Sequence, residues 1–373
     1  MSVIYLDNNA TTSVAPEVFE SMVPFFTEKY GNASSMHTFG GQVGKSIQEA
    51  REKVAAMLGA QPEEIVFTSC GTESDSTAVM SALQAQPEKK HVITTRVEHS
   101  ALIALGQHLE QKGYELTYLG VDSKGRLDLD ELSEAMRKDT AIVSIMFANN
   151  ETGTVFPIQK IAEMVKERGI LFHTDAVQAA GKLPIDLAKM PVDFLALSGH
   201  KLHAPKGVGA LYVRKGVRLL PRQIGGGQED GLRSGTEAAP AIAAFGAAAA
   251  AVPPFREQEA LYRRLRDRLL ERLSPLGVFH LPPEGVPYIV SLSLPGLRSE
   301  TLLHFLAERG IYVSGGSACS KGKRSPVLTA MGLPAGEIDS ALRVSFSWDN
   351  TLEEVDRLAE ALRLADHTLV RRP

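Results

Sequence analysis

Two polar residues in the middle of the chain each follow a predicted strand, and together they could hold a cofactor. Lys201 lies just past the apolar strand that opens FLALSGHKLHAPKGVGALYV, and Asp175 is at the end of the strand ILFHTDA. Either residue alone is more often a surface lysine or a helix cap. On one sheet, however, they match what pyridoxal phosphate requires, because a lysine amine forms its Schiff base and a carboxylate keeps its pyridine nitrogen protonated. Gln178 follows Asp175 in the same segment.

A phosphate site for such a cofactor is predicted at residues 68–74, TSCGTES. This segment follows the strand IVFTSC and begins a helix, so backbone N–H groups and the Thr72 hydroxyl would face an anion at the positive end of the helix dipole. An ordinary helix cap has the same pattern, and the two interpretations are compatible. His99, in RVEHSA, could stack on the cofactor ring or move protons, although a lone histidine is more often structural.

Cys319 is the residue that could act as a nucleophile. It lies in SGGSACSKGKRSP, a segment of glycines and serines that predicts an exposed, mobile loop. Lys321, Lys323 and Arg324 surround it with positive charge, which favours the reactive thiolate form of cysteine. A chance loop cysteine is the alternative interpretation, but the basic flank and the glycines argue against an inert, buried thiol.

Two other patterns predict no site. GGQVGKS, residues 40–46, resembles a phosphate-binding P-loop, but its spacing is one residue short and no strand precedes it. We therefore expect a helix there. His200 and His203 lie three residues apart in HKLH, but no third metal ligand lies nearby in the sequence.

Composition bounds the class of protein. The chain has 373 residues, with 40 Lys and Arg against 44 Asp and Glu and a formal net charge of −4. This balance gives no reason to expect nucleic acid or an anionic membrane as a partner. Its 2 cysteines exclude a disulfide-built secreted protein. The first residues, MSVIYLDNNATT, lack the cationic start and apolar run of a signal peptide, so we expect a cytoplasmic protein.

Alternating patterns between about residues 60 and 215 predict an α/β fold with a largely parallel sheet covered by helices. The predicted strands are IVFTSC, HVITTR, ELTYLG, AIVSIMFA, ILFHTDA, FLALSGH and GALYVR. The predicted helices outside and between them cover residues 16–30, 41–58, 157–168, 238–251 and 256–273. A smaller α+β unit follows, with strands YIVSLSLPG and LRVSFS and helices over residues 299–309 and 352–370. Thr351 and Glu354 predict a capping box at the start of the last helix.

Nine segments in order resemble the cysteine desulfurases, a group of fold-type I pyridoxal-phosphate enzymes in the class V aminotransferase family. These segments are YLDNNATT, GNASSMH, TSCGTES, EHSA, NNETG, HTDAVQAAGK, SGHKLHAPKGVGALYV, GGGQEDGLRSGT and SGGSACS. The resemblance implies a seven-stranded, mainly parallel large domain over residues 16–255 and a small domain over residues 256–373 that carries the Cys319 loop. Residues 1–15 would pack with the small domain. It also implies a homodimer with its sites at the interface.

The resemblance implies a role for each matching residue. Lys201, Cys319 and His99 would be catalytic. The cofactor would be bound by Gly71, Thr72, His99, Asp175, Gln178, Ser198, His200 and Lys201, and by Thr236 reaching in from a second subunit. The substrate would be bound by Asn32, His37, Asn150 and Arg343, with Arg343 as a bidentate clamp for its carboxylate. Two residues depart from the family pattern: Cys70 stands where glycine is usual, and Gly315 replaces a usual serine.

The activity that this resemblance implies is conversion of L-cysteine to L-alanine, with a persulfide formed on Cys319. The sulfur would pass to a protein acceptor, either for iron–sulfur cluster assembly or for thiolation of tRNA or a cofactor. A selenocysteine lyase or a small-substrate aminotransferase on the same scaffold is the alternative, and turnover with an α-keto acid would distinguish the aminotransferase. A catalytically idle binding subunit is a third hypothesis, which the set of Lys201, Asp175 and His99 argues against.

Overall fold

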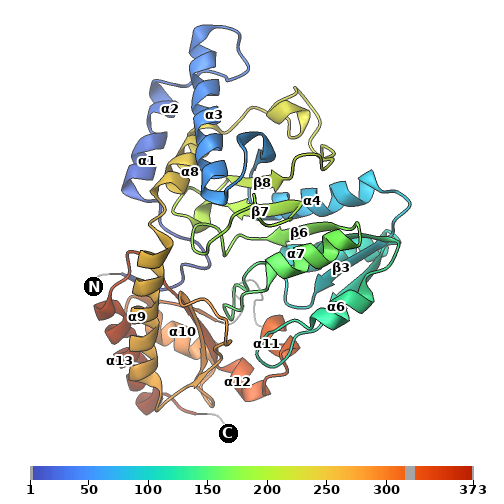
Figure 1. Cartoon of the computed structure of the whole chain (residues 1–373). Helices are drawn as coiled ribbons and strands as arrows, with labels where there is room; N and C mark the ends of the chain where they lie inside the picture. Colours follow the sequence, from blue (N-terminus) through green and yellow to red (C-terminus); the bar gives the residue numbers. More distant parts are fainter. Residues whose placement is uncertain (1–2, 316–323, 372–373) are drawn as a thin grey trace.

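The computed structural model describes residues 3–315 and 324–371, and its main feature is a large sheet with helices on both faces (Figure 1). The strand order is β2-β8-β7-β6-β5-β3-β4. The strands are β2(Ile65–Thr68), β3(His91–Thr95), β4(Glu115–Leu119), β5(Thr140–Ser144), β6(Leu171–Asp175), β7(Phe194–Ser198) and β8(Gly209–Val213). Only β8 runs antiparallel to its neighbours. The predicted seven-stranded, mainly parallel sheet is confirmed.

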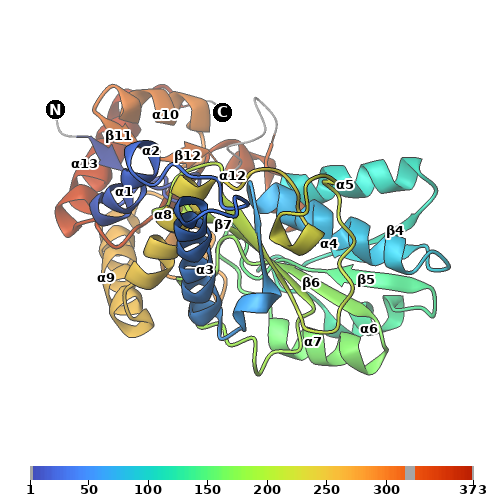
Figure 2. The same ribbon diagram turned by 90° about the horizontal axis from the view of Figure 1, so that it is seen from above.

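Because the sheet is covered on both faces, its strands appear in the sequence as nearly continuous runs of apolar residues. Strands such as β5 and β7 are buried along their whole length, while the edge strand β4 is partly exposed. Helices α4(Gly71–Ala85) and α5(Ser100–Gln111) cover one face of the sheet, and α6(Leu129–Ala135) and α7(Ile158–Glu167) cover the other (Figure 2). The buried residues of α7 are Ile158, Ile161, Ala162 and Val165, as its spacing predicts.

The helices before the sheet differ in one place from the prediction. A single helix over residues 16–30 is wrong: the chain forms α1(Pro16–Met22) and α2(Pro24–Thr27). Pro24 separates them because its ring nitrogen has no N–H to donate within a helix. Helix α3(Thr38–Leu58) contains GGQVGKS, as expected, and ends at Gly59 with φ of 64°. It packs against α8(Ala239–Ala251).

The C-terminal third forms a smaller unit around a four-stranded antiparallel sheet of order β12-β13-β10-β9. Its strands are β9(Val278–Phe279), β10(Ile289–Ser293), β12(Ser314–Gly315) and β13(Ala341–Ser345), and its helices are α9(Phe255–Leu273), α10(Ser299–Ala307), α11(Pro326–Ala330), α12(Ala335–Asp339) and α13(Leu352–Thr368). The capping box of Thr351 and Glu354 at the start of α13 is confirmed. Near the N-terminus, β1(Ile4–Tyr5) pairs in parallel with β11(Ile311–Tyr312).

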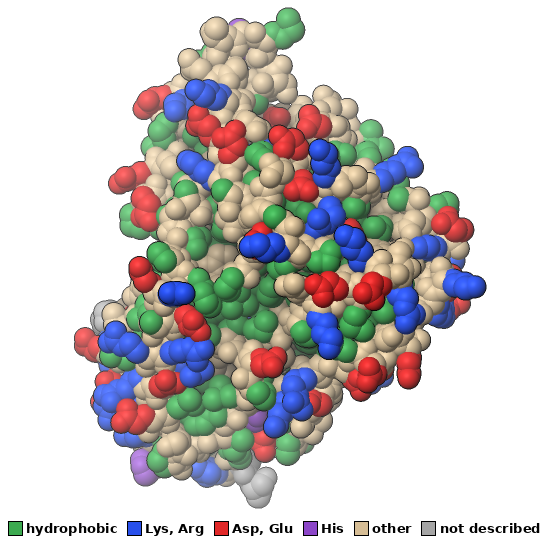
Figure 3. Space-filling model, in the orientation of Figure 1, with side chains coloured by type: hydrophobic (Ala, Val, Ile, Leu, Met, Phe, Trp, Pro, Cys, Tyr) green, Lys and Arg blue, Asp and Glu red, His purple; other side chains and the backbone are tan. Residues whose placement is uncertain are grey.

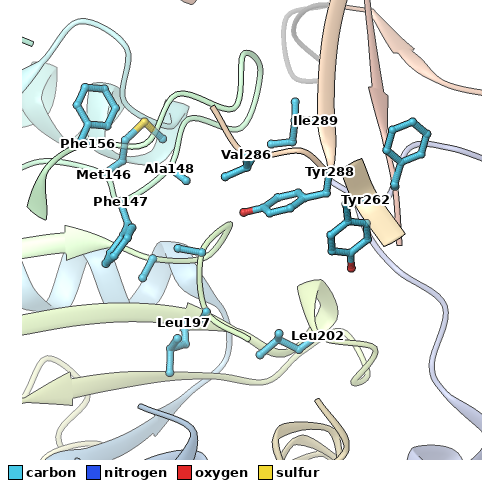
Figure 4. Packing of buried hydrophobic residues seen from close by; sticks show 14 of the residues in the cluster. Met146, Phe147, Ala148, Phe156, Leu197, Leu202, Tyr262, Val286, Tyr288 and Ile289 are labelled. Carbon is cyan, nitrogen blue, oxygen red and sulfur yellow. The ribbon is translucent and has the colours of Figure 1, made fainter. Parts of the chain in front are cut away.

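Three single turns of 3-10 helix complete the described structure: η1(Pro62–Glu64), η2(Gly199–Lys201) and η3(Glu229–Gly231). Buried aromatic residues join the smaller unit to the large sheet domain (Figure 4). The rings of Tyr262 and Tyr288 meet edge to face with centroids 5.4 Å apart. The Tyr288 hydroxyl donates a hydrogen bond of 2.7 Å to the Gln178 carbonyl. This contact fixes the chain that follows β6, where the cofactor residues were predicted.

The surface carries no dominant charge on the face that Figure 3 shows, where acidic and basic side chains are interspersed. This distribution agrees with the small net charge of −4. Among the helices of the described residues, none combines the length and the apolar character that crossing a membrane requires.

Candidate active site

A cavity of about 550 Å³ lies at the carboxyl ends of β6 and β7 and at the start of α4. Ligands of open α/β sheets bind at this edge of the strands. The predicted site residues that line the cavity are Gly71, Thr72, His99, Asn150, Asp175, Gln178, Ser198, His200, Lys201 and Arg343. Residues from six separate segments are therefore brought to one place.

Three of the predicted site residues that the structure describes do not line this cavity. Asn32 and His37 are exposed in the connection before α3, where Asn32 Oδ1 accepts from the Ser34 N–H at 2.9 Å and His37 Nδ1 caps the helix by accepting from the Gly40 N–H at 3.1 Å. Thr236 is exposed in the loop before α8. Cys319 lies outside the described residues.

The N-terminal segment forms one wall of the cavity. The Lys201 ammonium donates hydrogen bonds to the carbonyls of Asn9 and Ala10, the second at 2.9 Å. His200, the next residue, shares a hydrogen bond of 3.1 Å with the Thr11 hydroxyl. Burial and then the charge of Lys201 lower the pKa of His200 to about 4, so this side chain is neutral near pH 7. These contacts fix the backbone that carries Lys201.

Asp175 closes β6 with its carboxylate directed into the cavity. The Val177 N–H donates to Asp175 Oδ1 at 2.9 Å. Burial raises the pKa of Asp175, while His99, the Val177 N–H and Lys201 favour its charged form. An acid with these neighbours can hold a positively charged ring nitrogen.

Two further buried carboxyl groups lie beside Asp175, and the sequence analysis missed both. Glu98 accepts hydrogen bonds from the Thr95 hydroxyl at 2.8 Å and the Met146 N–H at 3.0 Å, and burial raises its pKa to about 8. Burial, followed by the charges of Asp175 and Glu98, raises the pKa of Asp75 well above its usual value. Glu98 is therefore mainly protonated near pH 7, and burial favours the neutral form of Asp75 as well.

The start of α4 forms a cradle for an anion. Its N-cap residue Cys70 gives the helix no side-chain hydrogen bond, and Gly71 and Thr72 of the first turn line the cavity, so the first N–H groups are not capped by a side chain of that residue. A Cβ atom on Gly71 would lie 2.7 Å from Val177 Cγ2, so the backbone approaches closely here only because residue 71 is glycine. The Ser198 hydroxyl beside it is buried and has no hydrogen-bond partner among the described residues. The helix dipole and these donors suit a phosphate group.

Arg343, on β13 of the smaller unit, is buried and also lines the cavity. It donates from Nη2 to Asp7 Oδ1 at 2.7 Å and from Nη1 to the Asn150 carbonyl at 3.0 Å. Glu151, next to Asn150, also lines the cavity and accepts from the Ser325 hydroxyl at 2.5 Å. Burial raises the pKa of Glu151 to about 7, while that hydrogen bond and the charge of Arg343 oppose the rise.

Several buried polar atoms of the cavity lining have no hydrogen-bond partner among the described residues, and a polar ligand such as pyridoxal phosphate could supply one. Buried atoms on its lining that have no hydrogen-bond partner in the part of the chain the structure describes include Asn9 Oδ1, Gln178 Oε1, Ser198 Oγ and Arg343 Nε. Buried polar atoms are rarely left unpaired in folded proteins, so a polar ligand is expected to satisfy them. A lysine amine, a carboxylate and an anion cradle lie around the same space, as this cofactor needs.

The HKLH pair does not form one site. His200 lines the cavity, whereas His203 is buried elsewhere, where its Nε2 shares a hydrogen bond of 2.6 Å with the Ser347 hydroxyl and its ring stacks on Trp348. Among the described residues, no group of three His, Cys, Asp or Glu side chains is arranged to hold a metal ion.

Comparison with known proteins agrees with this arrangement. The family model described as "Aminotransferase class-V" matches residues 4–358. A cysteine desulfurase from Nostoc sp. is 50% identical over 369 residues, which cover 97% of this chain and 92% of that protein. The chain belongs to the cysteine desulfurases of the class-V aminotransferase family.

Further relatives support the same membership. The cysteine desulfurase NifS of Azotobacter vinelandii is 48% identical over 366 residues, covering 96% of this chain and 91% of that protein. A solved structure titled "NIFS-LIKE PROTEIN" has a TM-score of 0.94 at 40% identity and covers 99% of this chain and 100% of that chain. The predicted family, fold, enzyme class and pyridoxal phosphate cofactor are confirmed, while the role of each site residue in this desulfurase stays a prediction.

Proposed function

We propose that this desulfurase converts L-cysteine to L-alanine and passes the sulfur to Cys319 as a persulfide. The observation that carries the proposal is the convergence of Lys201, Asp175 and Arg343 on one cavity, in a chain of the cysteine desulfurase family. Lys201 can bond to the aldehyde carbon of the cofactor, Asp175 can pair with its ring nitrogen, and Arg343 can bind the carboxylate of the substrate. An α-amino acid has an amine that can replace Lys201 on the cofactor and a carboxylate that Arg343 can bind.

The cofactor would be held along the length of the cavity. Lys201 would bind it covalently, Asp175 would pair with its pyridine nitrogen, and Gln178 would contact its phenolic oxygen. The start of α4, with Thr72 and Ser198, would bind its phosphate. When bound, pyridoxal phosphate would supply an electron-withdrawing ring that stabilises negative charge at the substrate Cα.

Proton movement would depend on Lys201 and His99. Lys201 lines the cavity, and its amine, when not bonded to the cofactor, would be the base that takes the Cα proton of the substrate. His99 caps α5, where its Nδ1 accepts from the Ala101 N–H at 3.2 Å, and this bond fixes its ring at the cavity wall. His99 would stack on the cofactor ring and assist the later proton transfers.

The sulfur step would use the Cys319 thiolate. It attacks the sulfur of the substrate, a sulfur–sulfur bond forms, and the carbon–sulfur bond breaks with its electron pair going to the carbon. That carbon takes up a proton and becomes the methyl group of L-alanine. Support for Cys319 comes from the SGGSACS segment and the basic residues after it.

The assembly would be a homodimer in which Thr236 of one subunit contacts the cofactor phosphate of the other. Thr236 is exposed and absent from the cavity of its own chain, as this role requires. Nearby Ile224 is 87% exposed, which suits a residue covered by a second subunit. A monomer that keeps full cofactor and activity in sedimentation and absorbance measurements would contradict this assignment. The sulfur acceptor would be a protein of iron–sulfur cluster assembly or of tRNA or cofactor thiolation.

The proposal is tested on the purified protein. We expect yellow protein, a covalent label on Lys201 after borohydride reduction, and L-alanine formation from L-cysteine. Lys201→Ala should abolish the label and the reaction. Protein that takes up the cofactor but forms no L-alanine from L-cysteine, with or without a reducing thiol, would contradict the proposed reaction.

A further inference from the structure

Asp7 and Arg343, which lines the cavity, form a largely buried ion pair. Arg343 Nη2 lies 2.7 Å from Asp7 Oδ1, and the side chains are 3% and 17% exposed, respectively. Such a pair is poorly screened by water, so its geometry matters more than that of a surface pair. No part of the reaction described above uses Asp7.

The backbone holds Asp7 firmly beside β13, the strand that carries Arg343. Asp7 forms a parallel bridge with Ser345, two residues beyond Arg343. The next residue, Asn8, donates from its N–H to the Ser345 carbonyl at 3.3 Å and from Nδ2 to Asn350 at 3.1 Å. The carboxylate of Asp7 is therefore a fixed point to which the guanidinium can be anchored.

The contacts of Arg343 leave part of its hydrogen-bonding capacity for a ligand. A guanidinium has five N–H groups in a rigid plane. Nη2 donates to Asp7 and Nη1 to the Asn150 carbonyl, whereas Nε is buried and has no partner among the described residues. Two anchors on the Nη atoms set the orientation of the plane, and the remaining N–H groups can face the cavity.

Glu151 makes this anchoring necessary. Its carboxyl group lines the same cavity and interacts electrostatically with Arg343. Without Asp7, Glu151 would be an alternative partner for the guanidinium, and Arg343 could turn toward it. A reoriented Arg343 would no longer present the same N–H groups to the substrate.

We propose that Asp7 is a positioning residue that orients Arg343 and thereby sets the preference of this site for amines that carry a carboxylate. The inference rests on the proposed function, in which Arg343 binds the carboxylate of an α-amino acid. Asp7 does not touch the substrate and acts only through Arg343.

The test compares two amines that differ only by a carboxylate, L-alanine and ethylamine. Each is titrated into the holoenzyme, and the change in cofactor absorbance gives an apparent dissociation constant. Asp7→Ala should weaken L-alanine binding about tenfold or more and change ethylamine binding less than about twofold, because only the carboxylate contact depends on Arg343. Asp7→Asn keeps an oxygen acceptor for Nη2, so it should recover part of the loss.

The matched control is Asp356→Ala. Asp356 pairs with Arg268 and Arg272 between α13 and α9 and does not line the cavity, so its loss should leave both dissociation constants unchanged. The proposal is overturned if Asp7→Ala weakens the binding of both amines equally, so that the ratio of their dissociation constants stays within twofold of the wild-type ratio. It is also overturned if Asp7→Ala binds L-alanine more tightly than wild type does, or if Asp7→Asn weakens the binding of both amines equally. The titration uses no sulfur chemistry, so it can succeed even where L-cysteine yields no L-alanine.

Discussion

Asp175 and Lys201 lie at the carboxyl ends of two strands that pair in parallel. Asp175 is the last residue of β6 and stands opposite Ala196 of β7, and Lys201 follows β7 by three residues. An acid and an amine from separate segments thus line one cavity, on a scaffold that is buried on both faces. This relationship explains how the fold could fix both ends of a cofactor ring.

Replacement of Asp175 by Asn should separate cofactor binding from catalysis. The amide keeps the shape of the side chain but loses the charge that would hold the pyridine nitrogen protonated. We expect protein that still binds the cofactor through Lys201, with kcat for L-alanine formation lower by about a hundredfold or more. Asp193→Asn is the control, because Asp193 lies at the amino ends of the same two strands, away from the cavity, where it accepts a hydrogen bond from the Phe172 N–H. Equal losses in both variants would argue against a special role of Asp175.

The close approach of Gly71 to Val177 predicts that a substitution at one position can compensate for a substitution at the other. Gly71→Ala should destabilise the protein by about 1–3 kcal/mol and weaken cofactor binding, because its Cβ would lie 2.7 Å from Val177 Cγ2. The obstructing atom belongs to a side chain, so Val177→Ala in the same protein should restore most of both losses. Urea unfolding and cofactor titration of the four proteins give the coupling energy. Additive effects of the two changes would show that this contact is not the cause.

Glu98 should make the stability of the protein depend on pH. Its pKa rises from 4.5 to about 8 on burial, so the unfolded chain releases this proton at lower pH than the folded protein does. The contribution of Glu98 to stability is therefore complete below about pH 4.5 and is lost as the pH rises toward 8. Glu98→Gln cannot ionise, so relative to wild type it should gain about 2 kcal/mol or more in unfolding free energy between about pH 5 and pH 8.

Urea unfolding at both pH values checks this prediction. Glu360→Gln, which removes an exposed carboxylate from α13, should show no comparable gain. If the difference between wild type and Glu98→Gln is the same at both pH values, the raised pKa of Glu98 is wrong.

The sheet could be predicted from sequence because its strands are short, mostly apolar and, apart from the edge strand β4, largely buried. Strand ends then predicted where Asp175 and Lys201 would lie. The break at Pro24 was missed, although a proline inside a helical pattern is a clear local signal.

Other parts of the site depend on tertiary contacts that no local pattern reports. Asp7, Asp75, Glu98 and Glu151 all line or adjoin the cavity, and the contacts of Asp7, Glu98 and Glu151 include partners far away in the sequence. The available signal was that Asp7, Glu98 and Glu151 lie inside the segments YLDNNATT, EHSA and NNETG, and that Asp75 directly follows TSCGTES. Asn32 and His37 came only from the resemblance. Their side chains accept hydrogen bonds from the backbone before and at the start of α3, and their role in substrate binding stays a prediction.

The central claim is that sulfur leaves L-cysteine by attack of the Cys319 thiolate, and Cys319→Ala tests it most directly. The measurement is L-alanine formed from L-cysteine by holoenzyme, together with the change in cofactor absorbance when L-cysteine is added. Cys70→Ala is the thiol control, since Cys70 lies at the start of α4, where the cofactor phosphate would bind. We predict that Cys319→Ala keeps the absorbance change but forms L-alanine at least about a hundredfold more slowly than wild type. Cys70→Ala should stay near wild type in both measurements. Near-normal L-alanine formation by Cys319→Ala would contradict the account and indicate a lyase that needs no thiol.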